Sequence, residues 1–416
     1  MARRKEPLIV GVVFVVSIAA QLLRQTGERS WRTVWAEDGR VFYGGTHDLS
    51  DLLSPHAGYM QLPGRTLGLI AQLVPIGDLS LFYAFAGATV TSLCALAVWY
   101  FSEELIGSVW LRAVLALQLV LLPTLLLEQL ANGVNTLWAV LFAGWWALLY
   151  LPRRRAQVVA PAAVVAVAAM SSALAFAFVP VAAVLAWRRA GLYRIVAVAF
   201  AAGCVVQAAV ALGASDDTVR GAGHLGDLPG VFSTRVLASM LVGEQWVDDG
   251  WQALGWGLGV LAAVIFVVVL VVVLRRSRGE AAALGVVSIV YGAGLYCLAV
   301  WGRGTVMMRI PDTYNSIGNR WSSLAIWFIT SGVVLCIAGN PRAVFIRWAT
   351  IATVGWFVVV SVAGFRGSNP RSPGPDWQPS VESARHACAD GDHPVTLAVV
   401  PYPFDVTISC AELRTR

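Results

Sequence analysis

The chain has 416 residues, of which 58% are hydrophobic and 13% are charged, and its mean hydropathy is +0.70. Soluble domains carry about 25% charged residues, so this composition excludes a soluble enzyme, a disordered tail and a fibrous repeat. Apolar runs such as Ala253–Leu274 and Val344–Phe365 reach the roughly 20 residues needed to cross a ~30 Å hydrocarbon layer. The sequence therefore predicts an all-α polytopic membrane protein.

The net charge of +6 is divided unevenly between alternate connections. We expect about 11 transmembrane helices, which places the two termini on opposite sides of the membrane. The connections on the N-terminal side hold half of the 30 Lys and Arg residues but only four of the 24 Asp and Glu residues. Short loops rich in Lys and Arg stay in the cytoplasm, so we expect a multi-pass protein of the cytoplasmic (inner) membrane with a cytoplasmic N-terminus and an external, periplasmic C-terminus. The positive charge is then a topology signal, and no nucleic-acid partner is expected. The expected spans are Pro7–Leu23, Leu79–Tyr100, Leu111–Leu127, Asn135–Leu151, Val158–Ser172, Ala173–Trp187, Val196–Leu212, Trp251–Leu274, Ala281–Val300, Trp321–Ala338 and Val344–Phe365.

The first span also fits a cleaved signal peptide, because Arg3–Lys5 precede an apolar run. The residues that follow it, Gln21–Arg32, are polar and bulky rather than small. Removing the span would also break the charge pattern downstream. A retained helix is the favoured interpretation.

The first external loop, 24–78, carries an acidic pair near the end of the first span. Glu37 and Asp38 lie between Trp35 and Gly39. Adjacent carboxylates near lipid and aromatic rings are candidates for a raised pKa and for general-base catalysis, although such pairs on ordinary loops are usually solvated. Later in the same loop, Thr66–Val74 is apolar but too short to span, and predicts a helix that lies in the interface or packs against other helices.

A second polar group, Glu128, Asn132 and Asn135, lies where the third expected span ends and the fourth begins. Polar groups at membrane depth are costly unless they are paired or face a cavity. A cavity lining and a helix–helix clamp or simple outer turn are equally compatible with this pattern.

Two further external loops, 213–250 and 301–320, are also expected to face outward. The apolar stretch Val231–Val242 predicts a second interfacial helix. The 301–320 loop carries Arg303, Arg309 and Arg320, and the planar fork of arginine matches phosphate oxygens. For Arg303 alone, anchoring at the membrane interface is favoured.

The C-terminal segment, 367–416, predicts a small external α+β appendage after a linker rich in proline. A helix is expected from Pro379, followed by strands over Thr396–Val400 and Asp405–Cys410. Cys388 and Cys410 both fall on apolar faces, and disulfides persist outside the cytoplasm. We therefore expect a Cys388–Cys410 disulfide that stabilises a core too small to be stable without one. No catalytic group of its own is expected there.

Taken in order, residues 7–365 resemble the GT-C superfamily of polytopic membrane glycosyltransferases, in particular bacterial members with Glu-Asp in the first external loop. On this resemblance, residues 1–366 form the transmembrane domain. Two features depart from the pattern: Trp321 replaces the more usual tyrosine, and the external tail is smaller than the soluble domains of many members. The residues that carry the resemblance are Glu37-Asp38, His56-Ala-Gly-Tyr59 before Pro63-Gly64-Arg65, Glu128 with Asn132, Asn135 and Trp138, and Asn319-Arg320-Trp321.

The resemblance implies an inverting glycosyltransferase at the outer face of the membrane. Its donor would be a polyprenyl-phosphate-linked sugar, and its acceptor a cell-envelope glycan or glycolipid. Asp38 is predicted as the essential base and Glu37 as a secondary group that orients the acceptor or a metal. Oxygen ligands of this kind suit a divalent cation, Mg or Mn, but nothing in the sequence requires one. The predicted phosphate-binding residues are Arg320, Arg309 and Arg65, and the predicted substrate-binding residues are His56, Tyr59, Glu128, Asn132 and Asn135.

Two other functions remain open at this point. A flippase or transporter of a lipid-linked sugar would place charges near the bilayer midplane, whereas the ionisable residues here cluster outside. An O-antigen ligase or polymerase would use a large late loop, for which Gly213–Gly250 with His224 is a weak counterpart. A purely structural subunit is the least favoured alternative.

Overall fold

The computed structural model describes residues 6–121, 129–214, 225–304, 319–367, 371–389, 391–402 and 404–416. Within these ranges the chain is mostly helical, with one two-stranded sheet near the C-terminus. The helices of the first half are α1 (Glu6–Leu23), α2 (Leu62–Ala71), α3 (Leu79–Phe101), α4 (Val109–Leu121), α5 (Thr136–Leu149), α6 (Val159–Ala169), α7 (Val179–Arg188) and α8 (Tyr193–Gly213). The later elements are α9 (Leu228–Phe232), α10 (Ser239–Val242), α11 (Glu244–Leu254), α12 (Trp256–Leu274), α13 (Gly279–Arg303), α14 (Asn319–Ala338), α15 (Ala343–Ala363), α16 (Trp377–Ala389), β1 (Val395–Ala398), β2 (Asp405–Ile408) and α17 (Cys410–Thr415).

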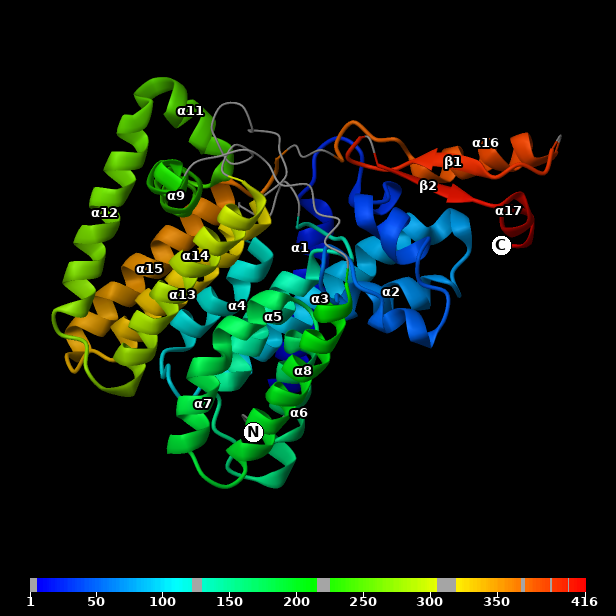
Figure 1. Ribbon diagram of the computed structural model, residues 1–416. Helices are drawn as coiled ribbons and strands as arrows, with labels where there is room; N and C mark the ends of the chain where they lie inside the picture. The colour runs from blue at the N-terminus through cyan, green and yellow to red at the C-terminus, as the bar shows by residue number, and fades with distance from the viewer. Residues whose placement is uncertain are drawn as a thin grey trace.

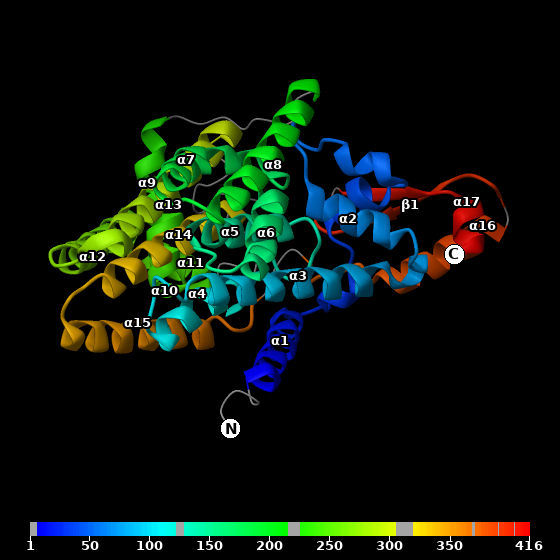
Figure 2. The ribbon, with the colours of Figure 1, turned by 90° about the horizontal axis from the view of Figure 1, so that it is seen from below.

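These elements form three groups that lie side by side (Figure 1). One group contains α12 to α15, the middle group contains α3 to α8, and the third contains α2 with the C-terminal helices and strands. The same order is kept in the view from below, where α1 stands at the edge of the middle group (Figure 2). The contacts between α1 and α3 place α1 against the middle group.

Seven helical segments of the described chain are long and apolar enough to cross a membrane. The protein is therefore membrane-embedded. The expected count of about 11 spans is not confirmed. Helices α5, α6 and α7 have only 10–14 residues, fewer than the roughly 20 that a span requires, and α1 and α4 each adjoin residues outside the described ranges. The seven segments are Ile76–Phe101, Tyr193–Gly213, Leu225–Val242, Trp256–Leu274, Gly279–Gly302, Arg320–Ala338 and Ala343–Ala363.

One of these segments, Leu225–Val242, lies inside the region predicted as the second external loop. The predicted interfacial helix covered only Val231–Val242. In the structure the apolar helical segment is longer. It begins with a short 3-10 turn (Leu225–Asp227) and continues through α9, the π-helical turn η10 (Ser233–Ala238) and α10.

The buried centre of the molecule contains α5 and α14. Every residue of α5 is buried, as is 89% of the apolar window in α14, and a helix that is apolar on all sides belongs in such a core. By contrast, only 22% of the window in α12 is buried, so its apolar surface is available to lipid. Gly285 of α13 and Gly332 of α14 face each other closely enough that a Cβ on either would clash with the other helix, which is typical of membrane helix contacts.

The C-terminal segment has the predicted α+β character. Strands β1 and β2 pair antiparallel, and the predicted Cys388–Cys410 disulfide is present, joining α16 to the start of α17. The short helix α17 was not predicted from the sequence.

This segment shares a hydrophobic core with the first loop and does not stand apart from it. Val381, Val406 and Leu413 pack in one cluster with Tyr43 and Leu67. The predicted boundary at residue 367 therefore does not separate two cores.

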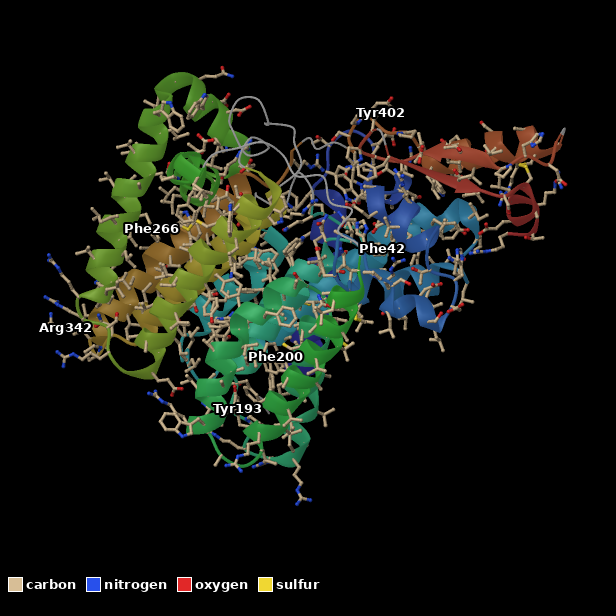
Figure 3. All side chains as sticks on the ribbon, viewed as in Figure 1. Phe42, Tyr193, Phe200, Phe266, Arg342 and Tyr402 are labelled. Atoms are coloured by element: carbon tan, nitrogen blue, oxygen red, sulfur yellow. A yellow bond between two sulfur atoms is a disulfide. The ribbon has the colours of Figure 1, made fainter. Side chains whose placement is uncertain are left out.

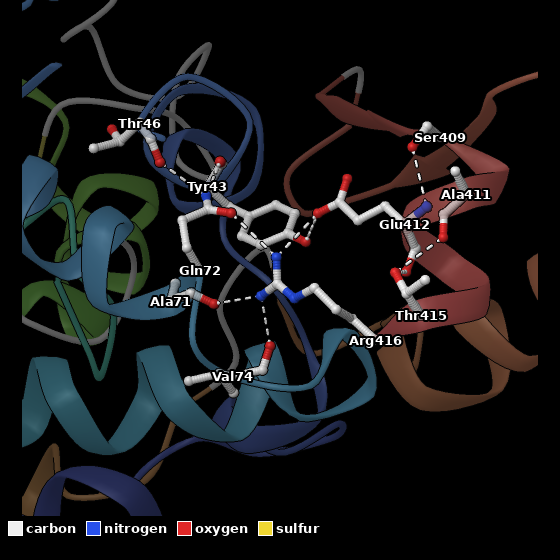
Figure 4. A network of polar contacts seen from close by, with 10 residues as sticks. All are labelled: Tyr43, Thr46, Ala71, Gln72, Val74, Ser409, Ala411, Glu412, Thr415 and Arg416. Atoms are coloured by element: carbon white, nitrogen blue, oxygen red, sulfur yellow. Dashed lines mark hydrogen bonds and ion pairs between the residues drawn. The ribbon is translucent and has the colours of Figure 1, made fainter. Parts of the chain in front are cut away.

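Polar contacts strengthen the same junction (Figure 4). The guanidinium of Arg416 donates to the carbonyl oxygens of Ala71 (2.9 Å) and Val74 (2.7 Å), and to the side chains of Gln72 and Glu412 (both 3.1 Å). The α17 helix is thereby tied to the end of α2.

Candidate functional site

Asp38 lies at the start of the π-helical turn η3 (Asp38–Tyr43) and is fully buried. Its carboxylate accepts backbone hydrogen bonds from Val134 at Oδ1 (2.7 Å) and from Gly133 at Oδ2 (2.9 Å). Burial raises the pKa of Asp38 to about 7, although these two hydrogen bonds and the nearby charge of Arg371 oppose that rise. Asp38 therefore joins the first loop to the turn before α5, and both of its oxygens are engaged in doing so.

Glu37, the preceding residue, is only half-buried. The backbone just before Glu37 is held by the C-terminal segment. Ala36 donates a backbone hydrogen bond to Val400 (2.6 Å), and Val400 donates one to Val34 (3.1 Å). The two adjacent carboxylates thus differ in access: Glu37 reaches the surface, whereas Asp38 does not.

The turn that receives Asp38, residues 129–135, contains two of the predicted substrate-binding residues. Asn132 accepts a hydrogen bond from the backbone of Asn135 (3.0 Å), and Asn135 accepts one from the indole of Trp138 (3.2 Å). Gly133 must remain glycine here, since a Cβ would lie 2.9 Å from Asp38 Oδ1. Both asparagines therefore shape the turn that holds Asp38, and their role toward a substrate stays a prediction.

Arg371 is the main residue of this site that sequence reasoning missed. It is buried, and its guanidinium donates to the carbonyl oxygens of Leu130 (2.8 Å), Ala131 (3.0 Å), Ser30 (2.8 Å) and Thr33 (2.9 Å), and also to the hydroxyl of Thr33 (3.0 Å). Burial lowers the pKa of Arg371 to about 10, and the charge of Asp38 opposes that change. A C-terminal arginine thus ties both sides of the Asp38 junction together.

The His56–Arg65 segment and the Glu37–Asp38 segment meet at the buried ring of Phe42. Its centroid lies 6.3 Å from the His56 ring and 5.8 Å from the Arg65 guanidinium. A Cβ on Gly64 would clash with this ring, which explains a glycine beside Arg65. The structure therefore brings the Glu37–Asp38 segment and the His56–Arg65 segment together.

Arg65, predicted to bind phosphate, is 5% exposed. It donates to the carbonyl oxygens of Val41 (3.0 Å), Gly45 (2.6 Å), Ser54 (3.1 Å) and Pro55 (3.4 Å), and to the hydroxyl of Thr46 (3.1 Å). These contacts join separate parts of the first loop, so the Arg65 side chain stabilises the loop in this structure. Its contact with a phosphate stays a prediction.

His56 and Tyr59 form a tight turn, with backbone hydrogen bonds of 2.9 Å and 3.3 Å between them. Both are half-buried. The following residue, Met60, is anchored to α8, because its backbone donates to the side chain of Gln207 (3.2 Å). The turn is therefore fixed against the transmembrane helices while its two side chains retain partial access.

Arg320, at the start of α14, approaches the site through its backbone. Its carbonyl accepts a hydrogen bond from the side chain of Gln129 (3.1 Å), and its half-exposed guanidinium lies 5.3 Å from the ring of Trp321. The start of α14 and the turn that holds Asp38 are thus neighbours in the structure. Arg309 and Glu128 lie outside the described residues, as does His224.

A buried ion pair was also missed. Arg235 and Glu244 are each 2% exposed and lie 2.6 Å apart, and Ser239 donates to the second oxygen of Glu244 (2.6 Å). The sequence signal was a lone arginine within an apolar stretch, followed nine residues later by a glutamate. Within the described ranges, no three or more His, Cys, Asp or Glu side chains gather as a metal site.

Comparison with family models, with curated proteins and with solved structures gave no match for this chain.

Proposed function

We propose that this protein is a membrane glycosyltransferase that acts at the outer face of the cytoplasmic membrane. It would move a sugar from a polyprenyl-phosphate donor to a cell-envelope glycan or glycolipid. The observation that carries the proposal is the convergence at Asp38. The acidic pair, the turn before α5 and the start of α14 are linked by the hydrogen bonds of Asp38 and Gln129. This convergence joins the loop that carries the half-buried Glu37 to the start of α14, which carries the half-exposed Arg320. A carboxylate and an arginine of this kind suit a reaction whose leaving group is a lipid phosphate.

The geometry favours Glu37 as the general base. A base must come within hydrogen-bond reach of the acceptor hydroxyl, and Glu37 is half-buried whereas Asp38 has no exposed surface. Asp38 would act as a positioning residue that sets the loop geometry. This division of roles reverses the one predicted from the sequence.

The half-exposed guanidinium of Arg320 is the described group best placed for the departing phosphate. In an inverting displacement, the acceptor oxygen attacks the anomeric carbon while the bond to the phosphate oxygen breaks. Glu37 takes the hydroxyl proton, and the phosphate leaves with the electron pair of the broken bond. Arg320 would stabilise that negative charge.

A flippase of lipid-linked sugar is the second candidate, and the Arg235–Glu244 pair favours it. Charged residues inside an apolar segment often mark a transport path, and Leu225–Val242 is such a segment with an interrupted helix. Against it, both side chains are buried and satisfied by each other.

The test uses purified full-length protein in detergent with radiolabelled polyprenyl-phosphate hexoses and pentoses and a cell-envelope glycan fraction. Detergent removes the two compartments, so label transferred to the glycan supports the glycosyltransferase and excludes a pure flippase. Absence of transfer, together with donor movement across proteoliposomes, would support the flippase instead.

The proposed orientation has the N-terminus in the cytoplasm and the site outside, on the strength of the arginine-rich connections. A reporter fused after Arg416 should be active only if it is an enzyme that works outside the cytoplasm. Activity of a cytoplasmic reporter at that position would reverse the orientation.

A further inference from the structure

A cavity of about 840 Å³ opens between the ends of α5, α7 and α13, away from the Asp38 site. Its walls are apolar and include Leu149, Val181 and Val287, while its rim carries charged side chains. The charged members are Glu104, Arg153, Arg188, Arg189 and Glu280. The cavity thus combines an apolar interior with an ionic edge.

The rim keeps one uncompensated positive charge. Arg153 pairs with Glu104 (3.1 Å), and Arg189 pairs with Glu280 (2.5 Å). Arg189 also donates to the carbonyl of Leu149 (2.7 Å), which fixes it in place. Arg188 is exposed and makes no hydrogen bond or ion pair within the described part of the chain. An occupant that neutralises the rim therefore needs a single negative charge.

The rim also lies where lipid headgroups are expected. Trp187, next to Arg188, is 85% exposed, and exposed tryptophans concentrate at the membrane–water interface. Trp110, the second residue of α4, and Trp348, in the second turn of α15, each lie close in sequence to an arginine and are 66% and 64% exposed. An apolar cavity with a cationic rim at this level faces lipid on one side and headgroups on the other.

We propose that this cavity is a specific binding site for a monoanionic glycerophospholipid such as phosphatidylglycerol. Its phosphodiester carries one negative charge, which the planar fork of Arg188 matches. The start of an acyl chain would lie along Val181, Val184 and Val287. Basic pockets between membrane helices bind anionic headgroups in this way, and about 300–1,000 Å³ is the usual size of a small-molecule site.

The test measures binding of dioctanoyl-phosphatidylglycerol to the delipidated full-length protein by native mass spectrometry and by thermal shift. We expect one saturable site and a stabilised protein, whereas dioctanoyl-phosphatidylcholine and free glycerol phosphate give neither. Arg188→Ala should weaken binding about 10–100-fold, as for loss of a charged hydrogen bond, and Arg188→Lys should lose less. Ala283→Trp, which fills the cavity without changing its charge, should also abolish the site.

Arg342→Ala is the matched control, because Arg342 projects from the surface of the molecule (Figure 3). It is not among the residues that line the cavity. The variant should bind the lipid as the wild type does. Equal binding by Arg188→Ala and the wild type, or equal losses in Arg188→Ala and Arg342→Ala, would overturn the proposal. Binding of glycerol phosphate with the same affinity as the lipid would show an anion site without lipid selectivity and would overturn it too.

Discussion

The burial of Asp38 predicts an unusual dependence of stability on pH. Burial raises the pKa of Asp38 from 3.8 to about 7 in the folded protein. In the unfolded chain the carboxyl loses its proton near pH 4, whereas in the folded chain it keeps it until about pH 7. The folded state therefore binds more protons between these values, and stability falls as pH rises through that window. At 1.36 kcal/mol for each pKa unit, the loss amounts to about 4 kcal/mol.

Asp38→Asn removes this dependence because the amide does not titrate. In the variant, the amide NH2 of asparagine faces one of the two backbone N–H donors and cannot accept its hydrogen bond. The loss of that hydrogen bond costs about 1–3 kcal/mol at every pH. The difference in stability between variant and wild type should therefore shift in favour of the variant by about 4 kcal/mol from pH 4 to pH 8. At roughly 2 °C per kcal/mol for a long chain, the difference between the melting temperatures of the variant and the wild type should change by about 8 °C over this pH range.

The assay is thermal unfolding of detergent-purified protein at half-unit steps from pH 4 to pH 8. Asp48→Asn is the control in the same loop. The pKa of Asp48 is lowered, chiefly by the hydroxyl of Ser50, so its contribution to stability is lost as pH falls through the acid range, the opposite sign. Parallel curves for Asp38→Asn and wild type across the whole range would refute the burial argument.

Three further changes test the packing and the phosphate assignment. Arg371→Ala should lower stability by about 3–5 kcal/mol, since it removes a buried charge and leaves its carbonyl partners unpaired; thermal unfolding measures the loss. Replacing Cys388 and Cys410 by serine opens a loop with a sequence separation of 22 and should cost about 3 kcal/mol, measured by unfolding and by trypsin cleavage of the tail. Arg320→Ala should raise the donor KM about 10–100-fold while changing kcat less, measured by steady-state transfer kinetics.

Each of these changes has its own control. Arg366→Ala removes an exposed arginine and should leave stability unchanged, so an equal loss in both arginine variants would contradict the bracing role of Arg371. Reductant should destabilise the wild type but not the serine variant, and a wild type indifferent to reductant would contradict the contribution of the disulfide. Arg320→Lys should restore part of the donor affinity, and an unchanged KM in Arg320→Ala would remove Arg320 from the phosphate site.

The features predicted correctly from the sequence are those with a local signal. The C-terminal strands follow from alternating residues such as Val406 and Ile408, and the disulfide follows from two cysteines on apolar faces. The junction between the first loop and the turn before α5 was expected only as two separate motifs. Its actual link, from Asp38 to Gly133 and Val134, spans 95 residues or more, and no periodicity encodes such a contact.

The features that were missed depend on tertiary partners. Arg371 lies in a stretch rich in proline and glycine, where an arginine is normally solvated, and only the converging carbonyls of distant segments make its burial possible. Leu225–Val242 was placed in an external loop in which only Val231–Val242 was predicted as a helix, and the segment contains the charged residue Arg235. The structure compensates that charge with Glu244, so the segment can remain apolar toward its surroundings.

The most direct test of the central claim compares transfer by Glu37→Gln, Asp38→Asn and the wild type at saturating donor. Glu37→Gln should lower turnover by about 10²–10⁴, the contribution of a general base, with thermal stability and donor binding unchanged. Asp38→Asn should retain more activity and change chiefly in stability. Near-native transfer by Glu37→Gln would contradict the account, whether Asp38→Asn then proves inactive or not.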